Sequence, residues 1–201
     1  MGKVYRTICN RRTIRRFQNK VIPKDLLTKF INAARLAPSS GNIQPCEFIV
    51  VDNPKMLNAI FPCLRWAAYI EPDGNPPKGE RPVAYIVALI NVQLRKKGGE
   101  EDVAAAIENI ILTACEEGIG SCWLHSIDRK QIKNLLQIPH HLNVNSIVAL
   151  GYPNEQPVVD VPQSSSIRYW KDHDGVIHVP KRTLEEIIHR NIYGHNHTDA
   201  V

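Results

Sequence analysis

The sequence predicts a single α+β domain in which helices surround a central mixed or antiparallel sheet. Three observations point to this class. Some segments carry apolar residues at helical spacing, others are short apolar runs rich in strand-forming residues, and the two kinds interleave without a strict β–α–β rhythm. A regular alternation of strands and helices would indicate a parallel sheet. Because this alternation is missing, a mixed or antiparallel sheet is favoured.

The two longest predicted helices have recognisable ends. Residues 23–36 start at Pro23, which a first turn tolerates, and stop before Pro38, which cannot continue a helix. Residues 102–118 start at Asp102, whose carboxylate can cap a helix. The apolar side chains of this second segment recur at i, i+4, i+7, i+8 and i+11 before a terminal glycine. Both segments are therefore expected to pack one face on a core.

Shorter elements are predicted in other parts of the chain. Residues 46–51, 83–92 and 146–150 are expected to be buried strands, because they are apolar and rich in β-formers. Residues 128–136 and 183–190 are expected to be helices.

The remaining segments are polar or irregular. Residues 164–171 and 176–179 predict a hairpin, because the Asp-Gly pair between them suits a tight turn. Residues 61–81 are rich in Pro and Gly and read as an irregular cover segment, and residues 195–201 as a disordered tail. No Gly/Ser/Pro-rich linker divides the chain, so we expect one domain over residues 1–201.

The composition argues against several classes of protein. A net charge of +5 would permit nucleic-acid binding, but only residues 11–16 and 95–97 cluster positive charge, and aromatics make up 6%. The five cysteines form no C-x-x-C pair, and no acid or cysteine stands at ligand spacing from the histidines, so we expect no disulfide framework and no metal site. No apolar stretch reaches about 18 residues. We therefore expect a cytoplasmic protein with neither a membrane nor a nucleic acid as partner.

Two segments near the start of the chain carry chemistry. Residues 11–17, Arg-Arg-Thr-Ile-Arg-Arg-Phe, hold four arginines in six positions, which can neutralise a phosphate dianion. Residues 37–45, Ala-Pro-Ser-Ser-Gly-Asn-Ile-Gln-Pro, supply short donors and acceptors that can line a planar polar ligand. Taken singly, they could be a solvated basic turn and a helix stop. Together they suggest a mononucleotide site.

These segments and four later ones resemble, in this order, the signatures of the nitroreductase family, whose members are flavin-dependent homodimers that use FMN. The later segments are residues 102–109, 118–124, 149–153 and 179–186. The resemblance implies a nitroreductase-like α+β fold and a homodimer with flavin at the subunit interface. One position departs from the family, because Cys46 stands where an aromatic residue is frequent.

The resemblance also implies which residues bind the cofactor. Residues 11–13 and Arg182 correspond to the phosphate and ribityl contacts. The partner subunit is expected to supply Pro38, Ser39, Ser40 and Asn42. Arg15 corresponds to the N1–O2 edge of the isoalloxazine, where a cation stabilises the negative charge of the reduced flavin. The whole implied set is Arg11, Arg12, Thr13, Arg15, Pro38, Ser39, Ser40, Asn42, Gln44, Trp123, Leu124, Lys181 and Arg182.

The resemblance finally implies a reaction. An FMN-dependent NAD(P)H oxidoreductase would pass a hydride from NADH or NADPH through flavin N5 to a nitroaromatic or quinone-like acceptor by a ping-pong mechanism. The sequence has no G-x-G-x-x-G fingerprint, so the nicotinamide nucleotide is expected to bind only transiently. No catalytic side chain is required, although His125 could donate a proton or be an ordinary core or surface histidine. Reductive dehalogenation, flavin cleavage or non-catalytic flavin binding remain alternatives on the same scaffold.

Overall fold

The computed structural model describes residues 1–71, 73–162 and 166–194 of the 201-residue chain. These residues fall into two compact units, Met1–Glu155 and Gln156–Val201, and each unit is described by itself. No change of composition marks this boundary, and the expectation of one domain stays a prediction. The predicted tail, residues 195–201, lies outside the described residues.

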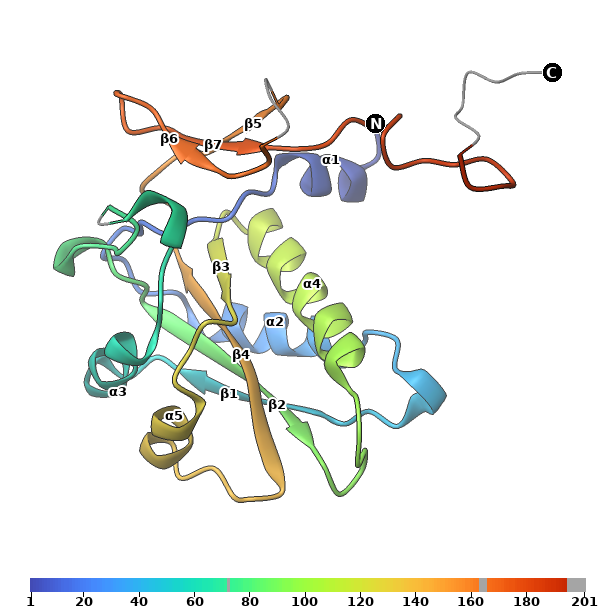
Figure 1. Cartoon of the computed structure of the whole chain (residues 1–201). Helices are drawn as coiled ribbons and strands as arrows, with labels where there is room; N and C mark the ends of the chain where they lie inside the picture. Colours follow the sequence, from blue (N-terminus) through green and yellow to red (C-terminus); the bar gives the residue numbers. More distant parts are fainter. Residues whose placement is uncertain (72, 163–165, 195–201) are drawn as a thin grey trace. The chain divides into compact units, whose positions relative to one another are not determined.

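The first unit is built around one four-stranded sheet with the strand order β1-β2-β4-β3 (Figure 1). Every neighbouring pair of strands is antiparallel. Of the two arrangements that the sequence predicts, mixed or antiparallel, this sheet is therefore the antiparallel one. The strands are β1 (Cys46–Val51), β2 (Ala84–Asn91), β3 (Gly120–Leu124) and β4 (Leu142–Gly151). The helices are α1 (Lys3–Asn10), α2 (Lys24–Arg35), α3 (Pro54–Ile60), α4 (Glu100–Glu116) and α5 (Arg129–Leu135).

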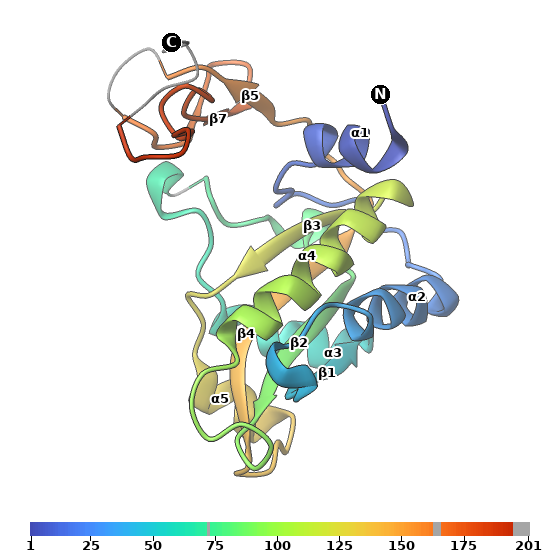
Figure 2. The same ribbon diagram turned by 90° about the vertical axis from the view of Figure 1, so that its right-hand side faces the viewer.

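Helices cover both faces of this sheet. Figure 2 shows α2 and α4 in front of the strands, with α3 and α5 behind them. Successive side chains of a strand point to opposite faces, so β2 supplies Ile86 and Ala88 to the core under α2 and α4, and Tyr85 and Val87 to the core under α3 and α5. β2 is consequently buried on both faces, which explains why it is a continuous apolar run.

The structure confirms the predicted strands and the first three predicted helices of this unit, with small shifts at their ends. One assignment was wrong. Asp102 does not cap α4, because the helix begins at Glu100 and is preceded by Gly99, whose φ of 105° is left-handed. Asp102 lies in the first turn instead, and its carboxylate accepts a hydrogen bond from the Ser40 amide at 3.0 Å.

Two helices of the first unit were not anticipated. The start of α3 has a sequence signal that could have found it, because the Asn53 side chain accepts from the amides of Lys55 and Met56 and Pro54 occupies the first position. Helix α1 has no buried residue, and Val4 and Tyr5 are exposed on it. A helix that buries nothing within its own chain leaves its apolar side chains available to another surface.

The expected cover segment, residues 61–81, is irregular in its described part. It contains three short 3₁₀ turns, Phe61–Cys63, Ala68–Ile70 and Lys78–Glu80. The rings of Phe61 and Trp66 are stacked 5.9 Å apart, and the Arg81 guanidinium lies 3.7 Å from the centre of the Phe61 ring. Aromatic stacking and a cation–π contact therefore order this segment in place of regular secondary structure.

The basic segment is attached to the sheet at β3 and at the end of β4. The Ile14 amide donates to the Ser121 carbonyl at 2.9 Å, and Ile14 and Phe17 are both buried. Two glycines permit this close approach. A Cβ on Gly120 would lie 2.8 Å from the Ile14 Cβ, and a Cβ on Gly151 would lie 2.9 Å from the Phe17 Cβ. The backbone of residues 13–17 therefore lies against the sheet at Gly120 and Gly151, where a residue with a side chain would clash.

The second unit contains a small three-stranded sheet with the order β5-β7-β6. Its strands are β5 (Val158–Asp160), β6 (Trp170–Lys171) and β7 (Ile177–Pro180). The predicted hairpin corresponds to the antiparallel pair β6 and β7, but β6 is shorter than expected, because residues 166–169 are not in a strand. Residues 164 and 165 lie outside the described residues. Strand β5, which pairs in parallel with β7, was not expected.

The helix predicted over residues 183–190 is wrong. These residues form turns in which the amides of Ile187 and Ile188 both donate to the Leu184 carbonyl. The apolar side chains that suggested a helix, Leu184 and Ile187, are 61% and 55% exposed. A helix this short is stable mainly through burial of its apolar face, and that burial is missing in the chain.

His178 joins the strands of the second unit. Its Nδ1 lies 3.3 Å from the Asp160 carboxylate, its Nε2 lies 3.1 Å from the Asp172 carboxylate, and its ring stacks on Trp170 at 4.1 Å. Hydrogen bonding to Asp172 and then to Asp160 raises the pKa of His178, while the same imidazole lowers the pKa of Asp172. When it is protonated, the imidazole can donate to both carboxylates across this sheet.

We expect Gly151→Ala to lower the free energy of unfolding by about 1–3 kcal/mol, the usual cost of overpacking a core. The added methyl group meets the fully buried Phe17 side chain near its backbone, where it cannot swing away. Denaturant unfolding measures the effect. Gly79→Ala is the matched control, because nothing lies within 4 Å of a Cβ at Gly79. Equal stability of both variants would contradict the close packing of Phe17.

We expect the contribution of His178 to stability to fall as pH rises. Because the folded pKa is raised above the ordinary 6.5, the contribution is fully present below that pH and is lost as pH passes through the raised pKa. The difference in unfolding free energy between the wild type and His178→Gln, measured from pH 5 to 9, should shrink across this window. His173→Ala is the control, since its side chain is 91% exposed. A pH-independent difference would contradict the bridge.

Candidate functional site

The basic segment presents two guanidinium groups without acidic partners. Arg11 follows the last residue of α1, and the Nη1 of Arg12 donates to the Arg11 carbonyl at 2.5 Å. Among the described residues, no carboxylate pairs with either side chain. Burial and then the charge of Arg11 lower the pKa of Arg12. This uncompensated positive charge is suited to binding an anion, and Thr13 next to it adds a hydroxyl group.

Two acids fix the other half of the segment. The Glu155 carboxylate accepts from the amide of Arg15 and, at 3.2 Å, from the amide of Arg16. The Arg16 side chain pairs with Glu80 at 2.5 Å, and the Asn154 amide group binds the same carboxylate at 2.9 Å. Arg16 is therefore structural, because its side chain is held by Glu80.

Sequence reasoning missed both of these acids. Glu155 is separated from Arg15 by 140 residues, and no local pattern in a single sequence links such positions. Carboxylates therefore hold the backbone of the segment, while the guanidinium groups of Arg11 and Arg12 have no acidic partner among the described residues.

The polar loop is preorganised by its own side chains. Asn42 and Gln44 have left-handed backbones, with φ of 54° and 53°, a conformation that costs about 1–3 kcal/mol unless the surroundings hold it. The Ser39 hydroxyl accepts from the Gln44 amide at 2.9 Å, and the Gln44 side chain donates to the Asn42 side chain at 2.9 Å. These bonds lock the donors and acceptors of the loop in one arrangement.

Asp102 joins the polar loop to α4. Besides binding the Ser40 amide, its carboxylate lies 3.2 Å from the Nη1 of Arg95, and Asp102 is only 5% exposed. The two facing atoms of this ion pair are buried and make no hydrogen bond, so the contact is electrostatic. Removing either partner would leave a charge with little access to water.

The basic segment and the polar loop lie at opposite ends of α4. At the last turn of α4, Cys115 affects the pKa of Arg12, and Glu116 pairs with Lys3 of α1. The loop contacts Asp102, which lies in the first turn of the same helix. Thirteen residues separate positions 102 and 115, which corresponds to about 20 Å along a helix. Figures 1 and 2 agree, since α1 lies by one end of α4 and the Ser40–Asn42 turn by the other. Within one chain the structure does not bring these two groups together.

Strand β3 carries the residues expected beside the flavin. The Trp123 side chain is half-buried, and its Nε1 donates to the Ser146 hydroxyl at 2.8 Å, whereas Leu124 is buried. The His125 ring lies 4.9 Å from the Trp123 ring. Partial burial and then the charge of Arg129 lower the pKa of His125. A neutral imidazole is thus favoured at this position.

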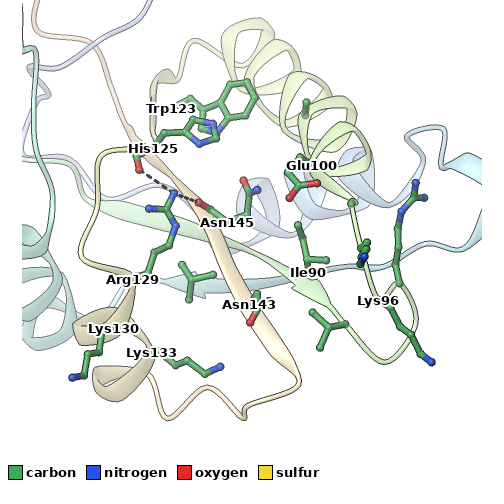
Figure 3. A pocket seen from close by; sticks show the side chains of 16 residues that line it. Ile90, Lys96, Glu100, Trp123, His125, Arg129, Lys130, Lys133, Asn143 and Asn145 are labelled. Atoms are coloured by element: carbon green, nitrogen blue, oxygen red, sulfur yellow. Dashed lines mark hydrogen bonds between the residues drawn. The ribbon is translucent and has the colours of Figure 1, made fainter.

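Trp123 and His125 line a cavity of about 1090 Å³ that sequence reasoning did not anticipate (Figure 3). The Arg129 guanidinium fixes part of its wall by donating to the His125 carbonyl at 3.1 Å and to the Asn145 carbonyl at 2.9 Å. Four separate stretches of the first unit contribute the lining, namely residues 90–104, 123–125, 129–133 and 143–145.

Lys181 and Arg182 belong to the second unit. The Lys181 amide donates to the Asp160 carbonyl at 3.0 Å, and the Arg182 guanidinium binds the Glu186 carbonyl at 2.7 Å with the Glu186 carboxylate at 3.6 Å. Both residues are exposed. Their part in a site of the first unit stays a prediction.

Within residues 1–71, 73–162 and 166–194, no group of three His, Cys, Asp or Glu side chains could hold a metal ion. In the same part of the chain, no helix is both long and apolar enough to cross a membrane.

Comparisons with known proteins agree with the fold and with the sequence signatures. The model of the nitroreductase family matches residues 8–152. A protein of Archaeoglobus fulgidus, "Putative NADH dehydrogenase/NAD(P)H nitroreductase", is 35% identical over 163 residues, which cover 78% of this chain and 88% of that protein. Its namesake from Methanothermobacter thermautotrophicus is 36% identical over 160 residues, or 77% and 79% of the two chains.

Solved structures give the same assignment. An FMN-dependent nitroreductase from Clostridium difficile R20291 is similar with a TM-score of 0.67 and 26% identity, covering 93% of this chain and 98% of that one. A Parabacteroides distasonis structure titled "Putative NADH dehydrogenase/NAD(P)H nitroreductase" shares the fold with a TM-score of 0.71 at 22% identity, covering 96% of this chain and 100% of that one. The chain belongs to the nitroreductase family of oxidoreductases.

Proposed function

We propose that the protein is an FMN-dependent NAD(P)H oxidoreductase that passes a hydride from NADH or NADPH through flavin N5 to a nitroaromatic or quinone-like acceptor in a ping-pong cycle. The observation that carries the proposal is the Arg11 and Arg12 pair, whose charge has no acidic partner among the described residues. The names of the similar proteins support it, since one solved relative is titled FMN-dependent and two curated relatives carry NAD(P)H in their names.

The residues present fit a phosphorylated flavin. Arg11, Arg12 and Thr13 would bind its single phosphate and ribityl hydroxyls, and Arg15 would lie at the N1–O2 edge, where its charge favours the reduced anion. The flavin, when bound, supplies the two-electron chemistry. The chain contributes binding, orientation and electrostatics, and β3, which carries the half-buried Trp123, would lie beside the ring.

We further propose a homodimer in which each site takes its polar loop, Pro38 to Asn42, from the partner subunit. The roughly 20 Å that separate the basic segment from the loop along α4 support this arrangement. The exposed apolar residues of α1 support a partner surface. The apolar stripe of α4 does not, because Val103, Ile107 and Ile110 are already buried against the sheet and α2 of the same chain.

Reductive dehalogenation is a second candidate, favoured by one comparison. The iodotyrosine deiodinase of Thermotoga neapolitana is 24% identical over 169 residues, covering 77% of this chain and 91% of that one. An acceptor screen with NADH that includes a nitroaromatic, a quinone and an iodinated phenol separates the two reactions. A cytoplasmic location accompanies either proposal, because the five cysteines are free thiols, the state that a reducing compartment maintains.

We expect the purified protein to release FMN on heating, and not FAD, because the basic segment matches one terminal phosphate. Arg12→Ala should weaken FMN binding by about 1.5–3 kcal/mol, the value of a charge-assisted hydrogen bond. Flavin fluorescence titration measures the affinity. Lys55→Ala is the control, since this exposed lysine of α3 lies on the face of the sheet opposite α4. Release of FAD, or a protein that cannot be loaded with FMN, would contradict the site.

We expect a heterodimer of an Arg15→Ala chain with an Asn42→Ala chain to regain part of the activity that both parents lack. If the two residues of one site come from different subunits, one site of the heterodimer is native and the other carries both lesions. Refolding the variants together and measuring NADH-dependent quinone reduction tests this. Activity no higher than that of either parent, in a preparation shown to contain heterodimer, would exclude the shared site.

A further inference from the structure

The cavity beside Trp123 is lined by two groups of cations. One group, Arg95, Lys96 and Lys97, follows β2, and the other consists of Arg129, Lys130 and Lys133 on α5. Figure 3 shows Lys96 on one side of the cavity and Lys130 and Lys133 on the other. Among its described lining residues, Glu100 is the single acid. The cavity thus concentrates positive charge far more than the net charge of +5 alone would imply.

Three of these cations already have structural partners. Arg95 pairs with Asp102 at 3.2 Å, Arg129 binds two backbone carbonyls, and Lys133 donates to the Leu142 carbonyl at 2.9 Å. The others, Lys96, Lys97 and Lys130, make neither an ion pair nor a hydrogen bond with any described residue. Their ammonium groups are therefore available to an anionic ligand in the cavity.

The inner wall offers an aromatic surface and an unsatisfied amide. Trp123 and His125 present their rings, and Asn145 lies on β4 where the register with β2 shifts, so that its side chain is displaced from the regular ladder. The Asn145 Oδ1 is buried and has no hydrogen-bond partner among the described residues. Figure 3 shows this amide group between Trp123 and Glu100. A buried acceptor of this kind favours a ligand that brings an N–H group.

We infer that this cavity binds the nicotinamide nucleotide and selects NADPH over NADH. The inference rests on the function proposed above. The carboxamide of nicotinamide supplies the N–H group that Asn145 lacks, and its ring suits the Trp123 and His125 surface, next to the strand assigned to the flavin. The 2′-phosphate of NADPH adds up to two negative charges, which Lys96, Lys97 and Lys130 can neutralise. The donor gives up one hydride in either case, so the extra phosphate acts on binding alone.

The test compares two donors that differ in this one phosphate. We expect the wild-type, FMN-loaded enzyme to have a kcat/KM for NADPH at least about tenfold above that for NADH, since one charge-assisted contact is worth such a factor. The ratio should fall severalfold in Lys96→Gln and Lys130→Gln, and in the wild type at high salt. Lys24→Gln, an exposed lysine at the start of α2, is the matched control and should keep the ratio.

A second measurement does not depend on turnover. Adenosine 2′,5′-bisphosphate carries the distinguishing phosphate and cannot be oxidised, so its binding to the purified protein is measured by calorimetry against AMP. We expect tighter binding of the bisphosphate in the wild type and in Lys24→Gln, and a loss of that difference in Lys130→Gln. A protein without oxidoreductase activity that still shows this pattern would contradict the proposed function while retaining the anion site. Equal binding of both nucleotides, or equal kcat/KM for both donors, overturns the inference.

Discussion

Everything that positions the site depends on the antiparallel pair β2 and β4, which is buried on both faces. Alternation along these strands attaches α2 and α4 to one face and α3 and α5 to the other. β4 also holds β3 at its free edge, and β3 holds the basic segment through Ser121. A change in the register of this pair would exchange the two cores and would displace β3, the arginines of the basic segment and the cavity together.

In the first unit, several acidic side chains have structural roles, while several basic side chains remain available to ligands. Glu155 and Glu80 hold the backbone and the side chain of residues 15–16, and Asp102 holds the polar loop. In contrast, Arg11, Arg12 and the lysines of the cavity face no carboxylate partner among the described residues. This asymmetry explains how a protein with a net charge of only +5 can present two places suited to phosphate groups.

The proposed donor and cofactor sites share β3 as a wall. Trp123 is tied to β4 through Ser146, and the His125 carbonyl is tied to α5 through Arg129. Arg129 also binds the carbonyl of Asn145 in the irregular stretch of β4, so one guanidinium orders three elements around the cavity. Such support by groups outside the ligand contacts is what keeps a binding surface preorganised.

The sequence by itself determined the local elements and the chemistry of the two N-terminal segments, because periodicity, helix caps and charge clusters depend only on residues that are close together in the sequence. It therefore predicted α2, α4 and α5, the strands β1, β2 and β4, and the pairing of β6 with β7, and it identified Arg11 and Asn42 as candidates. It failed at residues 183–190, where the periodic pattern has no surface to pack on. Only the tertiary structure decided that α4 separates the two segments, that Glu155 holds Arg15, and that four distant stretches enclose one cavity. These are contacts between residues far apart in the chain, and local periodicity carries no information about them.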